Sequence, residues 1–228
     1  MLGNHKKELK EARRGRKYYP DVLSLRGYEV RALAALGRID KVKQVIDESM
    51  AMAFTSSYTP GTVMRYAAEE LRAHGHEEAA MEIANRAVEW YKSHLTPTTY
   101  RYGLARALYL AKRWDEAHPI FEKLAAENLD NIDYKGFLGT LAARRGNREK
   151  ALEIFNELQQ TDQPYLFGEH TYWCARISSL LGDREQAVVL LKEAFAQGYE
   201  SPIDLHRDMD LESLRDYPPF QELVRPKQ

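Results

Sequence analysis

The stretch that decides the fold is TTYRYGLARALYLAKRWDEAHPIFEKLAAENLD, residues 98 to 130. Its first half repeats apolar residues on one helical face at Leu104 and Leu108. Its second half does the same at Ala117 and Phe121. The pattern predicts two helices folded back on each other. Because neither helix can bury its apolar face alone, we expect neighbours of the same kind and a helical repeat array with a shared core.

Similar helix pairs are predicted before and after this stretch, and glycine marks the turn inside most of them. Glycine accepts the left-handed conformation that often follows the end of a helix, because it has no Cβ to clash. The turn positions are Gly37, Gly75, Gly146 and Gly182, and Lys112 occupies the equivalent place in residues 98 to 130. We expect a less favourable turn at Lys112.

A fixed order of small and large side chains accompanies these turns. A small residue is needed where the two helices of a pair cross closely, and the alanines at this place recur at intervals of about 34 to 37 residues. In the second helices this column is Val42, Ala80, Ala117, Ala151 and Ala187, followed one turn later by Ile46, Ala84, Phe121, Phe155 and Leu191. In the first helices the matching column is Val30, Ala68, Ala105, Gly139 and Ala175. We expect all of these positions to be buried.

This ladder resembles the tetratricopeptide repeat (TPR), a degenerate helix-turn-helix unit of about 34 residues. The resemblance is best over residues 98–131 and 132–165. It implies an all-α fold, a right-handed superhelical solenoid of antiparallel helix pairs. We expect a basic, partly ordered leader at 1–20, in which Gly15 interrupts any helix. About five TPR-like hairpins would follow at 21–200, and capping helices at 201–228.

The C-terminal segment DMDLESLRDYPPFQELV, residues 208 to 224, is similar to the closing motif of TPR domains in multidomain bacterial signalling proteins. The resemblance implies a bacterial protein. We expect a short helix from Ser201 and Pro202, followed by a cap that covers the last repeat. The apolar residues predicted to form that cover are Leu211, Leu214, Phe220 and Leu223.

Composition narrows the range of functions. The chain carries 33 basic and 34 acidic residues, which argues against nucleic acid as a partner. Its apolar runs are too short to span a bilayer, so no membrane partner is expected. Its one cysteine, Cys174, excludes an internal disulfide and suits a reducing compartment, so we expect a cytoplasmic protein.

No arrangement typical of catalysis stands out, and we expect neither an enzyme nor a cofactor. His74 and His76 flank a turn glycine at a spacing that does not place two metal ligands on one helical face, so no metal is expected. Cys174 falls in a packing region and is expected to be buried. Asp208 and Asp210 are interpreted as part of a solvated charge run.

Binding is the favoured function. In a stacked array, first-helix residues off the packing columns are expected to face a concave groove. The predicted partner-binding residues are Arg31, Arg65, Arg72, Tyr102, Arg106, Tyr109, Arg144, Tyr172 and Arg176. Glu69 and Thr140 occupy similar helical positions. Arginine and tyrosine suit carboxylates and rigid contact area, so we expect a protein or peptide partner of acidic character. The alternative is self-association, with the chain acting as the homodimerisation module of a larger bacterial signalling or regulatory protein.

Overall fold

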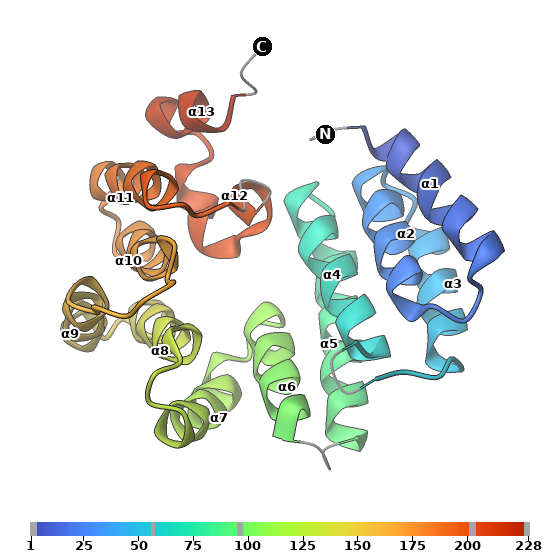
Figure 1. Cartoon of the computed structure of the whole chain (residues 1–228), viewed down its shortest axis with the longest axis horizontal. Coiled ribbons are helices and arrows are strands. Elements are labelled where there is room, and N and C mark those ends of the chain that lie inside the picture. The colour runs from blue at the N-terminus through green and yellow to red at the C-terminus, as the bar shows by residue number, and fades with distance from the viewer. Residues whose placement is uncertain (1–3, 56–57, 95–97, 201–203, 226–228) are drawn as a thin grey trace. The chain divides into compact units, whose positions relative to one another are not determined.

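The computed structural model of the chain describes residues 4–55, 58–94, 98–200 and 204–225, and every regular element in them is helical (Figure 1). The elements are α1 (His5–Tyr18), α2 (Leu23–Ala35), α3 (Ile39–Met50), α4 (Pro60–Ala73), α5 (Glu77–Ser93), α6 (Thr98–Leu110), α7 (Trp114–Glu127), α8 (Ile132–Arg144), α9 (Arg148–Gln159), α10 (Glu169–Leu180), α11 (Arg184–Ala196), α12 (Asp204–Arg207), the 3-10 helix η1 (Met209–Leu214) and α13 (Pro218–Val224). The predicted all-α class, built of TPR-like antiparallel helix pairs, is confirmed.

The helices belong to two compact units, Met1–Ala117 and His118–Gln228, called unit 1 and unit 2 below. Unit 1 contains α1 to α6 and the first residues of α7, and unit 2 contains the rest of α7 and all later elements. Within unit 1, the first helices α2 and α4 pack together, and each packs on its own second helix, α3 or α5. Within unit 2, α8 and α10 pack together in the same way, with α9 and α11 as their second helices.

The predicted packing columns are buried. Every residue of the small column in the second helices is completely inaccessible to solvent. In the first-helix column, Gly139 has no room for a side chain, because a Cβ there would lie 2.5 Å from Ile177. Phe155 is the exception in the larger column, since it is only half-buried. Ile154 is buried in its place and approaches Gly139, while Ala151 and Leu158 of the same helix are buried, so α9 differs from the prediction at this one position.

The predicted turns are also confirmed. Gly37, Gly75, Gly146 and Gly182 have φ angles of 66°, 80°, 75° and 86°, all in the left-handed region. Lys112 adopts the same conformation with φ of 57°, although it carries a Cβ. The geometry of the repeat therefore fixes the backbone conformation at this position, even where the residue is not glycine.

The N-terminal segment differs from the prediction. Gly15 lies inside α1 and does not interrupt the helix, which packs against α2. Glycine suits this position for a steric reason, because a Cβ at Gly15 would lie 3.0 Å from the side chain of Leu25. Leu9 and Ala12 are buried on the same helix. Glycine at this point serves the close approach of α1 to α2.

The C-terminal elements lie against the last helix pair of unit 2, where η1 contacts α10 and α13 contacts α11. Leu211, Leu214 and Phe220 are buried, and Leu223 is half-buried. The helix start predicted at Ser201 and Pro202 lies outside the described residues.

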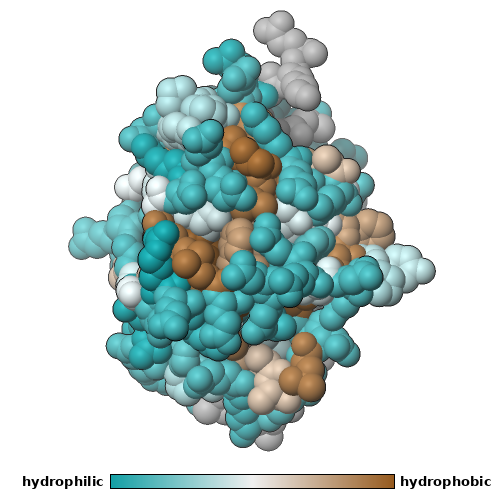
Figure 2. Space-filling view, turned by 90° about the vertical axis from the view of Figure 1, so that its left-hand side faces the viewer, coloured by the Kyte–Doolittle hydropathy of each residue, from teal (hydrophilic) through white to brown (hydrophobic). Residues whose placement is uncertain are grey.

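None of the helices in the described parts of the chain combines the length and the apolar composition needed to cross a membrane. One face of the molecule, shown in Figure 2, is mostly hydrophilic and carries separated apolar areas. The large apolar side chains exposed in unit 2 are Leu129, Leu152, Tyr165, Phe167 and Val189. Scattered exposed apolar side chains are normal for a folded domain.

Candidate partner-binding surfaces

All nine predicted partner-binding residues lie on first helices, on α2, α4 and α6 in unit 1 and on α8 and α10 in unit 2. Four of them are half-buried, namely Arg31, Tyr102, Arg106 and Arg144. The other five are buried, namely Arg65, Arg72, Tyr109, Tyr172 and Arg176. The expectation that all nine side chains point into an open groove is therefore wrong for more than half of the set, because ion pairs and packing hold those residues.

In unit 1, Glu69 joins arginines from two helices. Its Oε1 lies 2.6 Å from Nη1 of Arg65 on the same helix, α4, and 3.4 Å from Nη2 of Arg106 on α6. Burial acts to lower the pKa of Arg65, but the Glu69 carboxylate and the neighbouring tyrosines raise it above its ordinary value. The guanidinium of Arg106 also lies 5.7 Å from the ring centre of Tyr102, within cation–π range.

Tyr66 is a further member of this surface that the sequence pattern did not identify. Its ring centre lies 4.6 Å from the guanidinium carbon of Arg65 and 5.9 Å from that of Arg31. Nε of Arg31 lies 3.9 Å from Oε2 of Glu70, a long ion pair. The helical position of Tyr66 does not predict that it belongs to this surface, because its contact with Arg31 depends on how α2 packs against α4. We call Arg31, Tyr66, Glu69, Tyr102 and Arg106 the arginine–tyrosine face.

Arg72 and Tyr109 serve packing within unit 1. Nη2 of Arg72 donates a hydrogen bond of 2.8 Å to the carbonyl oxygen of Leu110, which belongs to the last turn of α6. The terminal carbonyls of a helix have no partners within it, so Arg72 satisfies one of them and attaches α4 to α6. Tyr109 is 2% exposed. Both side chains are buried within unit 1.

In unit 2, the predicted arginines converge on Asp210 of η1. Nε of Arg144 lies 3.0 Å from Oδ1 of this carboxylate, while Nη2 of Arg176 lies 2.7 Å from Oδ2. Arg144 also donates to the carbonyl oxygen of Met209 at 3.1 Å. Asp210 is 1% exposed, so this is a buried ion-pair network. Arg176 is further packed over the ring of Trp173, at 3.8 Å from the ring centre.

Asp208 extends this network. Its Oδ2 accepts a hydrogen bond of 2.8 Å from the hydroxyl of Tyr172 and lies 2.9 Å from Nε of Arg176. Its Oδ1 caps η1 by accepting from the backbone N–H of Asp210 at 2.8 Å. Burial raises the pKa of Asp208 to about 6, although the nearby Arg176 acts to lower it. The interpretation of Asp208 and Asp210 as a solvated charge run is wrong, because both carboxylates are enclosed by first-helix side chains. Thr140, by contrast, donates a hydrogen bond to the carbonyl oxygen of Phe137 in its own helix.

Glu169→Gln is expected to stabilise unit 2 near pH 7.5 and to change its stability little near pH 4. Burial, together with the neighbouring Asp133 carboxylate, raises the pKa of Glu169 to about 7. The folded chain therefore keeps a proton that the unfolded chain has lost, so the wild type loses stability as the pH rises from about 4.5 to 7. Glutamine cannot ionise. At pH 7.5 the variant is therefore expected to gain on the order of 1 kcal/mol in its free energy of unfolding, after allowance for screening at this half-exposed site.

Denaturant melts of both proteins at pH 4, 5.5 and 7.5 measure this gain. The matched control is Glu185→Gln, since Glu185 is an exposed carboxylate in the first turn of α11. A Glu169→Gln effect that stays constant over the three pH values would contradict the prediction.

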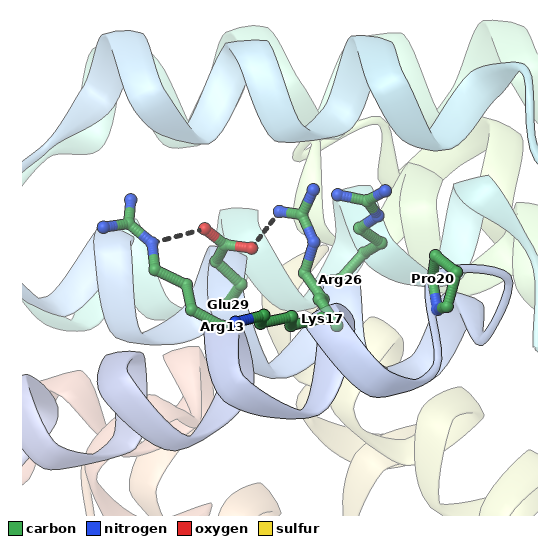
Figure 3. Close-up of a pocket in the computed structure, with 6 residues that line it drawn as sticks. Arg13, Lys17, Pro20, Arg26 and Glu29 are labelled. Atoms are coloured by element: carbon green, nitrogen blue, oxygen red, sulfur yellow. Dashed lines mark hydrogen bonds and ion pairs between the residues drawn. The ribbon is translucent and has the colours of Figure 1, made fainter.

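An open basic pocket lies between α1 and α2 in unit 1, with Arg13, Arg16, Lys17, Arg26 and Glu29 in its lining (Figure 3). Glu29 is buried and binds both Arg13, at 2.9 Å, and Arg16. A second carboxylate, that of Glu48 on α3, lies 2.8 Å from Arg16 and 2.9 Å from Arg26. Three arginines thus meet two carboxylates. Their main effect is to hold the basic helix α1 on α2 and α3.

Cys174 is completely buried on α10, as predicted. Burial raises the pKa of its thiol to about 12, so almost no thiolate exists at neutral pH. Because the thiolate is the nucleophile, this cysteine is not activated for covalent chemistry.

No family model and no curated protein matches the chain. Among solved structures, it is similar to one described as MamA AMB-1, with 16% identity and a TM-score of 0.38 over 74% of this chain and 95% of that one. It is also similar to one described as MamA MSR-1, with 16% identity and a TM-score of 0.38 over 77% of this chain and 95% of that one. The assignment of the fold rests on the helix pairs described above.

Proposed function

We propose that the protein is a non-enzymatic interaction module that binds an acidic segment of a partner protein at the arginine–tyrosine face of unit 1. The observation that supports this most directly lies in unit 2. There, two arginines and a tyrosine from first helices enclose the aspartates of a short segment, Asp208 to Asp210, that belongs to no repeat. First-helix arginines of this chain thus already bind one acidic peptide segment.

The arginine–tyrosine face of unit 1 has the same chemistry in a more accessible form. The side chains of Arg31 and Arg106 are 18% and 32% exposed. Arg31 lies 3.9 Å from Glu70, a long ion pair, and Arg106 lies 3.4 Å from Glu69, which Arg65 holds at 2.6 Å. A guanidinium can bind a carboxylate with two parallel hydrogen bonds, and the long pair of Arg31 with Glu70 does not have that geometry. A partner carboxylate would therefore gain hydrogen bonds at Arg31, and Arg106 would supply a second positive charge on the same face.

The double substitution Arg31→Glu with Arg106→Glu is expected to weaken binding of an acidic peptide about tenfold or more, because it replaces attraction by repulsion at both accessible arginines. The probe is a fluorescein-labelled peptide DMDLESL, the sequence of residues 208 to 214. Fluorescence polarisation with the full chain measures its affinity, and the peptide NMNLESL, which lacks the two aspartates, is expected to bind more weakly.

The control for this experiment is Lys10→Glu with Arg14→Glu, which makes the same charge change at two exposed positions of α1. This control is expected to retain binding. Equal affinity in the wild type and in the Arg31 and Arg106 variant would overturn the proposed function. Arg176 is unsuitable as a probe, because its reversal would place a third carboxylate beside Asp208 and Asp210.

Self-association is the second candidate, in which the arginines of this face meet acidic side chains on the surface of another copy of the chain. In that case light scattering would show a mass that rises with protein concentration, and the Arg31 and Arg106 reversals would return the chain to a monomer. A constant monomer mass, together with peptide binding, would favour a separate acidic partner.

A further inference from the structure

Unit 1 brings together three side chains that commonly bind metal ions. His5 is the first residue of α1, Glu70 lies near the end of α4, and His74 directly follows the last residue of α4. One ligand atom from each of the three lies within 4.8 Å of the others. The two imidazole rings meet edge to face, with their centres 5.3 Å apart. In sequence these residues lie far apart, and only the packing of α1 makes them neighbours.

The pair on α4 already has the spacing that a metal ion requires. Glu70 and His74 are four residues apart and share one helical face. Nε2 of His74 lies 3.3 Å from Oε1 of Glu70. Ligand atoms about 2.0 to 2.1 Å from a tetrahedral zinc ion stand roughly 3.3 to 3.5 Å from each other. The other oxygen of Glu70 faces Arg31 at 3.9 Å, so Oε1 is the oxygen that lies on the side of His74.

The third ligand is oriented by a carboxylate of its own helix. Nδ1 of His5 lies 3.4 Å from Oε2 of Glu8, one turn further along α1. When Glu8 accepts a hydrogen bond from Nδ1–H, Nε2 of the ring keeps its lone pair. This is the arrangement in which a carboxylate fixes the tautomer of a metal-binding histidine and raises its basicity.

We propose that His5, Glu70 and His74 form a site for a divalent transition-metal ion, for which Zn²⁺ is the test ion. Two imidazole nitrogens and one carboxylate oxygen are a ligand set that zinc accepts, and three protein ligands leave a fourth position for water. The site differs from the combination of His74 with His76 that the sequence argued against. His76 lies beside Gly37, where its Nε2 would be 3.1 Å from an added Cβ. A bound ion would attach α1 to α4.

The test is titration of the full chain with Zn²⁺ by calorimetry at pH 7.5, with Co²⁺ absorption as a measure of coordination. We expect one zinc ion per chain. His5→Gln and His74→Gln, on two different helices, are each expected to weaken zinc binding about tenfold or more. Zinc is also expected to raise the melting temperature of the wild type relative to EDTA, and this rise is lost in both variants.

The matched control is His118→Gln. His118 and Glu122 form a histidine–glutamate pair with the same four-residue spacing and the same 3.3 Å separation, in the part of the chain where the structure places no third ligand beside them. This variant is expected to bind zinc as the wild type does. Absence of saturable binding, or equal binding by His5→Gln and the wild type, would overturn the site. Because His5 is partly exposed at a helix end, the melting temperature of His5→Gln in EDTA is expected to match that of the wild type.

Discussion

Asp210→Asn is expected to lower the free energy of unfolding of unit 2 by about 3 to 5 kcal/mol, the usual loss when one partner of a buried ion pair is removed. The Asp210 side chain has no exposed surface and lies between Arg144 and Arg176. Asparagine would fill the same space. However, its neutral amide group would remove the carboxylate that the two guanidinium groups share, and its NH₂ would face their N–H donors; Asp208 would still lie 2.9 Å from Arg176.

Asp216→Asn is the control for this prediction. Asp216 pairs with Arg184, but its side chain is 80% exposed, and exposed pairs contribute only about 0 to 1 kcal/mol. Urea denaturation followed by circular dichroism measures both variants. Similar losses for Asp210→Asn and Asp216→Asn would show that the buried network does not hold η1 against α8 and α10.

Gly168→Ala is expected to destabilise unit 2 by roughly 3 kcal/mol, from backbone strain and a clash that cannot relax cheaply. Gly168 precedes α10 with φ of 81°, in the left-handed region. A Cβ at this position would lie 2.3 Å from the backbone oxygen of Ala194, and backbone atoms in a packed helix cannot move aside as a flexible side chain can. The helices α10 and α11 would have to separate.

Gly182→Ala is the control that separates backbone strain from the steric clash. Gly182 has a similar φ of 86°, but nothing lies within 4 Å of an added Cβ. Its substitution is expected to cost only about 1 kcal/mol, the strain of a left-handed residue that has a Cβ. Chemical denaturation of both variants gives the difference. Equal losses would mean that the contact with Ala194 contributes nothing.

The sequence predicted the features that depend on how residues are spaced within one helix pair. The buried alanines at 80, 117, 151 and 187 and the left-handed turns follow from the close crossing of two helices that are neighbours in sequence. Even the irregular turn at Lys112 was predictable, because the repeat fixed its position. Phe155 was misplaced by one residue because Ile154 and Phe155 are both apolar, and only the packing against Gly139 decides between them.

The binding residues were harder to predict, because the partner of a charged side chain lies elsewhere in the chain. Arg144 and Arg176 were correctly placed on first helices, but Asp210 lies far along the sequence, in a segment whose acidic residues resemble a solvated run. In the same way, His5 gave no sign of its proximity to His74, because nothing in the sequence of α1 reveals how that helix packs. Spacing predicts the elements, whereas long-range pairing decides which side chains remain accessible.

The solitary thiol of Cys174 also has a practical consequence. A cysteine introduced at an exposed position would be the only one to react with a maleimide dye at neutral pH, because the native thiol is enclosed and retains its proton. In the unaltered chain, slow labelling of Cys174 would instead report the rate at which α10 is uncovered. The protein thus carries a built-in reporter for the opening of unit 2.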